Sequence, residues 1–386
     1  MPADELTALL TLNRIDGLGC TGAKYLYREF GSALEIFRQR DHLKDIIPGI
    51  DTHIVDALCG SGYDSFVREE LDFIEKHGIR CVTVADSDYP ARMLDLDDAP
   101  LVLFSLGNVN YNAARVVAIV GTRKATEYGR RMCHTFVREL HQICPDVVIV
   151  SGLAYGIDIE SHKAALDEGL PTIGVLAHGL DMIYPSSHRP VAKRMLPDGG
   201  LVTEFMSGTV PLGHNFVRRN RIIAGLSDAV LVVESAAKSG SLITAEIAAS
   251  YSRECFAFPG SVGDPYSVGC NELIRDNCAA LITSALDFAN AMNWNDALRK
   301  EPVQKDLFPE LTDQENRVYQ RVRLKAQGVH ISTLMTELNI PYPMLLQPAR
   351  TSANVSSKLP VYHGSAMSRP TPANAESLRI FETSSG

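Results

Sequence analysis

The sequence has 386 residues, which at about 150 residues per domain indicates two or three domains. Its 45% hydrophobic and 22% charged residues are typical of globular proteins and exclude a fibrous, collagen-like or wholly disordered chain. The net charge of −9 lies in residues 1–100, with 19 Asp and Glu against 10 Lys and Arg, whereas residues 101–386 hold 27 of each. A nucleic-acid site must therefore be a local basic patch.

Neither a membrane span nor a secretory signal is expected. No apolar run approaches the roughly 18 residues of a span, and the acidic N-terminus has no basic region before an apolar one. The eight cysteines form no CxxC pair and no His/Cys cluster with zinc spacing. We therefore expect a cytoplasmic protein with reduced, mostly packed thiols and no metal site.

Residues 1–66 are predicted to form a small helical domain. Apolar residues at helical spacing predict helices over 6–15, 22–30 and 32–39. Gly-containing turns at 15–20 and 47–51 link helices as in helix-hairpin-helix units. Glycines of this kind can bring backbone N–H groups to a phosphate, but the segment is net acidic, so we interpret both as tight interhelical turns.

Residues 67–290 are predicted to form a doubly wound α/β domain. After a helix over 68–77 and strands over 79–84 and 101–105, short apolar runs alternate with helical stretches. The runs are Val116–Val120, Val147–Val150, Thr172–Leu176, Leu201–Thr203, Ala229–Glu234 and Cys255–Phe258. Because these runs are almost continuously apolar, they predict a mostly parallel sheet that is covered on both faces.

The C-terminal part divides into three predicted segments. Residues 291–311 form a linker, and residues 312–346 contain two helices, 312–325 and 332–338, as at the start of a winged helix. Residues 347–386 hold eight Ser and four Pro without a clear period, so they are predicted to be disordered.

Three predicted strands end in loops of small residues, 121–129, 151–158 and 238–246. In a doubly wound sheet such loops lie together at the carboxyl edge, where ligands bind. With Arg123 in the first loop, they predict a phosphate-binding crevice. None is GxGxxG or GxxxxGK[ST], so no dinucleotide or ATP chemistry and no cofactor is expected.

The strongest basic stretch is His214–Gly225, in which Phe216 precedes three arginines. An arginine can fork onto a phosphate and an aromatic ring can stack a base, which is how single strands are bound. The alternative is a solvated basic helix start with Phe216 in the core, and the spacing alone leaves both open.

Acidic and histidine side chains also follow the strands, at Asp158, His178, Asp181 and Glu204. Any of these could be a general acid or base, but no nucleophile–base pair or metal cluster emerges. We interpret Asp158 and Asp181 as helix caps or loop anchors. We therefore assign no catalytic residue among these four.

At these residues the sequence resembles the DNA-processing protein A family (DprA, also called Smf), over roughly residues 5–285. The motifs follow the family's order. They are Gly121–Arg123 with Tyr128 and Gly129, Ser151–Asp158, Gly179–Pro185, Phe216 with Arg219–Gly225, Ser239–Ala245, Phe258–Gly260 and Gly269–Arg275.

The resemblance implies an extended Rossmann-like domain that binds single-stranded DNA, with a sterile-alpha-motif-like domain before it and a small winged helix behind. It also implies a homodimer that protects incoming single strands in natural transformation and helps to load the recombinase RecA. By motif, Arg123 would hold phosphate and Phe216 would stack a base. The pocket would be completed by Arg219, Asn220 and Arg221, and by donors from Ser239, Gly240, Ser241 and Thr244.

The sequence departs from the family in two places. Gly213 stands where members often carry a basic residue, so one phosphate contact is missing or replaced by His214. After Ile340 the apolar pattern stops, so the winged helix is incomplete, as a shifted reading frame or an engineered end would produce.

The resemblance implies a role in which no catalytic activity is central, and an enzyme is the alternative function. Related Rossmann-like folds cleave the base from nucleoside monophosphates, usually with a Pro-Gly-Gly-x-Gly-Thr loop followed by a Glu. The comparable loop, 238–246, ends in Glu246 but lacks the paired glycines. A phosphoribohydrolase activity is therefore the second hypothesis.

Overall fold

The structure is a computed structural model that describes residues 3–60, 64–295, 313, 317–318, 320–321 and 331–341. The chain separates into two compact units, Met1–Leu298 and Arg299–Gly386. In the second unit, helix α15 (Ile331–Leu338) agrees with the helix expected at 332–338. Most of the predicted linker 291–311, most of the helix predicted at 312–325 and the whole tail 347–386 lie outside the described residues.

A nine-stranded sheet runs through the first unit in the order β1-β2-β6-β5-β4-β3-β7-β8-β9. Its strands are Arg80–Thr83 (β1), Val102–Gly107 (β2), Val116–Val120 (β3), Val148–Ser151 (β4), Thr172–Val175 (β5), Gly200–Thr203 (β6), Ala229–Val232 (β7), Glu254–Ala257 (β8) and Ala280–Leu281 (β9). β2 pairs antiparallel with β1 and β6, and the remaining neighbours are parallel. The expected mostly parallel sheet is confirmed, with β9 as an unforeseen addition.

The sheet reverses its winding beside β3. The chain proceeds from β3 through β4 and β5 to β6 on one side, and then crosses to β7, β8 and β9 on the other. The switch point therefore lies between β3 and β7, and the predicted crevice would lie there, at the carboxyl ends of the strands.

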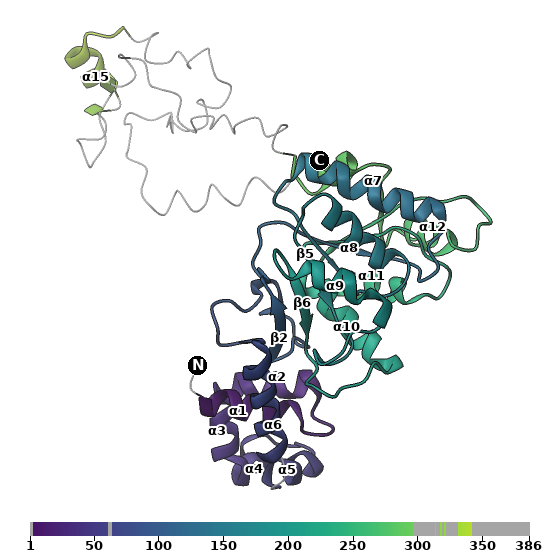
Figure 1. The fold of residues 1–386 in the computed structure, drawn as a ribbon. Coiled ribbons are helices and arrows are strands. Elements are labelled where there is room, and N and C mark those ends of the chain that lie inside the picture. Colours follow the sequence, from purple (N-terminus) through teal and green to yellow (C-terminus); the bar gives the residue numbers. More distant parts are fainter. Residues whose placement is uncertain are drawn as a thin grey trace. The chain divides into compact units, whose positions relative to one another are not determined.

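Helices cover both faces of the sheet (Figure 1). One face packs on α7 (Glu127–Ile143), α8 (Ile157–Asp167) and α13 (Ala285–Ala291). The other packs on α10 (Gly213–Leu226), α11 (Gly240–Ser250) and α12 (Val268–Arg275). Alternate residues of β3 supply the two cores, with Val117 and Ile119 on one face and Ala118 and Val120 on the other. A further helix, α9 (Arg189–Met195), packs on β5 and β6.

The N-terminal helices form one layer beside β2 (Figure 1). They are α1 (Ala3–Asn13), α2 (Gly19–Phe30), α3 (Ala33–Arg38), α4 (Leu43–Ile46), α5 (Thr52–Cys59) and α6 (Asp64–His77). Their apolar side chains share a core with Leu101 and Phe104 of the sheet region and with Met206. α6 crosses the predicted boundary at residue 66, and its Val67 belongs to this same core.

Candidate nucleic-acid interface

The loops that follow β3, β4 and β7 meet at the carboxyl edge. Thr122 donates its backbone N–H to the carbonyl of Glu234 at 2.7 Å, and Ile157 donates to the carbonyl of Thr122 at 3.1 Å. The side chain of Asn220, on α10, donates to the carbonyl of Gly240 at 3.3 Å and so ties α10 to the start of α11. The three loops are thus in contact at one edge of the sheet, although they are far apart in the sequence.

Two glycines in these loops serve close packing between protein segments. Gly156 has a φ of +78°, and a Cβ there would overlap the carbonyl oxygen of Thr122. A Cβ on Gly152 would overlap the guanidinium of Arg219. The small residues of these loops predicted a phosphate site. At these two positions, however, the missing side chain makes space for Thr122 and for Arg219.

Glu234 joins two of these loops, a role that the sequence analysis did not assign to it. Its buried carboxylate accepts hydrogen bonds from the backbone N–H of Thr126 at 2.9 Å and from its hydroxyl at 2.6 Å. Thr126 is the N-cap of α7, and its hydroxyl also accepts from the N–H of Gly129. Gly129 carries no side chain where a Cβ would overlap the Glu234 carboxylate. The sequence signal for this residue is that Glu234 is an acidic residue at the end of the apolar run Ala229–Glu234.

Arg123 and Phe216 meet at the mouth of the crevice. The Arg123 guanidinium is exposed and lies 5.0 Å from the centroid of the half-buried Phe216 ring. The Tyr184 ring approaches Phe216 edge-on at 6.1 Å. A cation beside an aromatic face at this distance is stabilised by the ring and remains free to contact an anion. The two residues predicted to hold phosphate and to stack a base are therefore neighbours.

Arg219 supports Phe216 from inside the protein. Its guanidinium lies 5.9 Å from the same ring, is only 3% exposed and donates to the carbonyl of Val175 at 2.7 Å. Burial lowers its pKa to about 10, while the nearby Asp158 carboxylate acts in the opposite direction. Burial likewise raises the pKa of Asp158, against the effect of Arg219. Arg219 is thus a buried cation behind the crevice surface.

Arg221 lies on a different face of α10 and is already paired. Its guanidinium donates to the buried Glu204 carboxylate and to the backbone carbonyl of Asp98, and contacts the Cys20 thiol at 3.1 Å. Arg218, one turn earlier, also pairs with Glu204 at 3.4 Å. Arg221, predicted to complete the DNA pocket with Arg219 and Asn220, is thus engaged in the contact between α2 and α10, and its place in that pocket stays a prediction.

The predicted hydroxyl donors are largely engaged with the protein. Ser239 and Ser241 bond to each other at 2.7 Å and to Ser235 at 2.6 and 3.0 Å. Thr244 is buried and donates to the carbonyl of Gly240 at 3.2 Å. Gly240 and Ser239 are the more accessible of this group, so Ser241 and Thr244 shape the start of α11 from beneath.

The acid and base candidates hold loops. His178 donates from Nδ1 to the carbonyl of Gly179 and accepts the N–H of Tyr184 at Nε2, and burial lowers its pKa. Asp181 accepts the N–H of Gly208 at 3.1 Å. Within the described residues no three His, Cys, Asp or Glu side chains could hold a metal, and no helix there is both long and apolar enough to cross a membrane.

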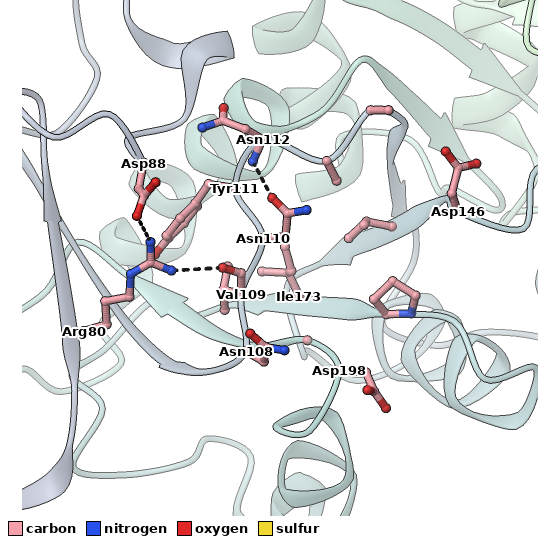
Figure 2. Close-up of a pocket in the computed structure, with 15 residues that line it drawn as sticks. Arg80, Asp88, Asn108, Val109, Asn110, Tyr111, Asn112, Asp146, Ile173 and Asp198 are labelled. Carbon is pink, nitrogen blue, oxygen red and sulfur yellow. Dashed lines mark hydrogen bonds and ion pairs between the residues drawn. The ribbon is translucent and has the colours of Figure 1, made fainter.

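A cavity of about 610 Å³ lies at the opposite, amino edge of the parallel strands (Figure 2). Val148, at the start of β4, is among its lining residues. Figure 2 shows the Arg80 guanidinium bonded to the Asp88 carboxylate and to a backbone carbonyl. The nitrogen–oxygen distance between Arg80 and Asp88 is 2.6 Å. Asp146 and Asp198 add two more carboxylates to the lining. This acidic cavity with a neutralised arginine does not suit a polyanion.

Residues 80–293 match the protein family described as DNA recombination-mediator protein A. Protein Smf of Escherichia coli K12 is 45% identical over 257 residues, which cover 64% of this chain and 68% of that protein. DNA processing protein DprA of Streptococcus pneumoniae R6 is 40% identical over 205 residues, which cover 53% of this chain and 71% of that protein.

Two solved structures are also similar. The X-ray structure of DNA processing protein A from Streptococcus pneumoniae matches with a TM-score of 0.63 at 31% identity, over 74% of this chain and 97% of that one. DNA processing protein A from Helicobacter pylori, solved in a study of its single-stranded DNA binding mode, matches with a TM-score of 0.50 at 30% identity. That match covers 56% of this chain and 95% of the other.

Proposed function

Because the chain belongs to the DNA recombination-mediator protein A family, we propose that it binds single-stranded DNA at the carboxyl edge of its sheet. Arg123 contacts a phosphate and Phe216 stacks a base, while Asn220, Ser239 and Gly240 border the same crevice. The protein binds the strand without forming a covalent bond. The family is one of recombination mediators rather than of enzymes.

The observation that carries this proposal is the contact between Arg123 and Phe216. An exposed guanidinium lies 5.0 Å from a half-exposed aromatic ring, and no described acidic side chain forms an ion pair with that guanidinium. The arginine is therefore available to a phosphate while the ring is available to the attached base. The Helicobacter pylori relative, whose study concerns single-stranded DNA binding, shares this fold.

The biological role follows from the family. We infer that the protein acts in the cytoplasm as a homodimer, protects single strands taken up in natural transformation and helps to load the RecA recombinase onto them. The support is the family assignment and the similarity to Smf and DprA proteins. The predicted phosphoribohydrolase alternative finds no support at Glu246, which is exposed on α11.

Fluorescence anisotropy with labelled oligo-dT at several salt concentrations tests the site. We expect Arg123→Ala to weaken binding and to reduce the slope of log K against log salt by about 0.7, the value for one phosphate contact on a single strand. Phe216→Ala should weaken binding about five- to 150-fold with little change of slope, because stacking carries no charge.

Arg38→Ala is the matched control, because Arg38 is an exposed arginine on helix α3 and far along the sequence from the crevice. It should bind oligo-dT with the affinity and the salt slope of the wild type. An Arg123→Ala variant whose slope equals that of the wild type contradicts the proposed site.

A further inference from the structure

Two more exposed aromatic rings lie close to the Arg123–Phe216 pair. Tyr184, which contacts Phe216, is 46% exposed. Tyr155, in the loop between β4 and α8, is 50% exposed, and its ring packs edge-on against His188 at 5.0 Å. Single exposed aromatics are common on protein surfaces, so their arrangement decides whether they matter.

One short segment, residues 184–188, connects the two tyrosines. Its first residue, Tyr184, contacts Phe216, and its last, His188, contacts Tyr155. Both ends are anchored. The N–H of Tyr184 donates to His178 Nε2 at 3.2 Å, and Nδ1 of the buried His188 donates to a backbone carbonyl at 2.8 Å. One anchored segment therefore links Phe216, through Tyr184 and His188, to Tyr155.

The surrounding charges favour a strand that runs from Phe216 toward Tyr155. Tyr155 precedes Gly156, which packs against the backbone of Thr122 and Arg123, so the loop of Tyr155 adjoins the loop that carries the free guanidinium. The opposite face of α10 is closed to a strand, because Arg221 is buried there with Glu204 against α2. The layer that contains α2 also belongs to the acidic first quarter of the chain.

We propose that Phe216, Tyr184 and Tyr155 form a stacking track, along which bases of one DNA single strand stack in this order. This inference rests on the proposed function and extends its site from one base to several. Aromatic rings stack any base, so the track is tolerant of sequence.

The length of the track sets the number of nucleotides. Four residue steps separate Tyr184 from His188, and they span about 8 Å as a 3₁₀ turn and about 13 Å if extended. At about 3.4 Å per stacked nucleotide, the strand covers that interval in two to four nucleotides. Phe216 at one end and Tyr155 at the other therefore contact bases that are not adjacent.

The test compares Tyr155→Ala and Tyr184→Ala with Tyr155→Phe and Tyr184→Phe. Binding is measured by anisotropy with oligo-dT and with an abasic strand of equal length, which keeps the phosphates and lacks the bases. We expect each Ala variant to lose about five- to 150-fold in affinity for oligo-dT and each Phe variant to bind like the wild type. On the abasic strand all five proteins should bind alike.

Tyr25→Ala is the matched control, because Tyr25 is 49% exposed on α2 in the helical layer, and it should leave binding unchanged. Two outcomes overturn the track. In the first, the Ala variants keep wild-type affinity for oligo-dT. In the second, their affinity for the abasic strand falls as much as their affinity for oligo-dT, as a collapsed loop would cause. If Arg123→Ala still weakens binding in those cases, only the track is wrong. If Arg123→Ala also has no effect, the proposed function is wrong as well.

Discussion

His162 is a side chain whose charge is set by burial. It is fully buried in α8, where Nδ1 donates to the Thr172 hydroxyl at 2.7 Å, and Nε2 has no partner among the described residues. Burial lowers its pKa from 6.5 to about 3, and the neighbouring Arg219 and His188 act in the same direction. The native protein therefore keeps this imidazole neutral, whereas the unfolded chain protonates it near pH 6.5.

This difference predicts an acid sensitivity. Because the folded pKa lies below the unfolded one, the stabilising contribution is complete above pH 6.5 and is lost progressively as the pH falls toward 3. The loss is about 1.4 kcal/mol per pH unit, or about 2 kcal/mol at pH 5. We expect the free energy of unfolding in urea to fall between pH 7 and pH 5, and to fall by about 2 kcal/mol less in His162→Asn than in the wild type.

The exposed His53, replaced in the same way, supplies the comparison, and His53→Asn should show the acid loss of the wild type. If His162→Asn and the wild type lose equal free energy between the two pH values, the imidazole is not the source of the sensitivity.

At the scale of the element, α10 presents two faces with different tasks. Successive residues of a helix are about 100° apart, so Phe216, Arg219 and Asn220 share one face, while Arg218 and Arg221 share another. The first face borders the crevice, and the second holds the helical layer through Glu204. The arginines of this motif therefore lie on two faces of α10.

The two faces predict separable defects. Arg221→Ala leaves the Glu204 carboxylate buried without its closest partner, which costs about 3–5 kcal/mol. We expect a lower midpoint of urea unfolding and an unchanged salt slope in oligo-dT binding. Arg221→Lys, which keeps a cation beside Glu204, should recover part of the stability and serves if the alanine variant does not fold. A reduced slope of log K against log salt in Arg221→Lys would instead indicate that Arg221 contacts the DNA.

The elements were largely predictable, whereas the roles of side chains within them were less so. Apolar runs such as Val116–Val120 locate strands to within two residues, because a strand buried on both faces has no other composition. β9 is two exposed residues without such a run. The pairing of Arg221 with Glu204 could not be predicted without the fold, because the two residues are 17 positions apart and lie in different elements. The helical period is the sequence signal that could have placed Arg221 and Phe216 on different faces of α10.

At the scale of the whole molecule, the helical layer and the sheet share one core. Leu101, Phe104 and Met206 are at most 5% exposed because they pack against the N-terminal helices. Exposing three such side chains costs roughly 5–9 kcal/mol, comparable with the 5–15 kcal/mol that stabilises a whole domain. The predicted division of the chain at residue 66 stays a prediction that stability measurements can test.

A fragment that starts at residue 79 should therefore be poorly folded, although it keeps every strand. Compared with residues 1–298, we expect it to bind the dye ANS, to aggregate in size-exclusion chromatography and to unfold at a lower temperature. Residues 1–298 should unfold in one transition. A monodisperse shorter fragment with the same unfolding temperature would show that the helical layer is an independent domain.

The Glu234 carboxylate lies at the N-terminus of α7, where it accepts two hydrogen bonds from Thr126. The positive end of a helix beside a switch point is a place that otherwise attracts an anion. The chain thus places its own negative charge where a free phosphate would be attracted. We therefore expect inorganic phosphate to bind weakly at this helix end.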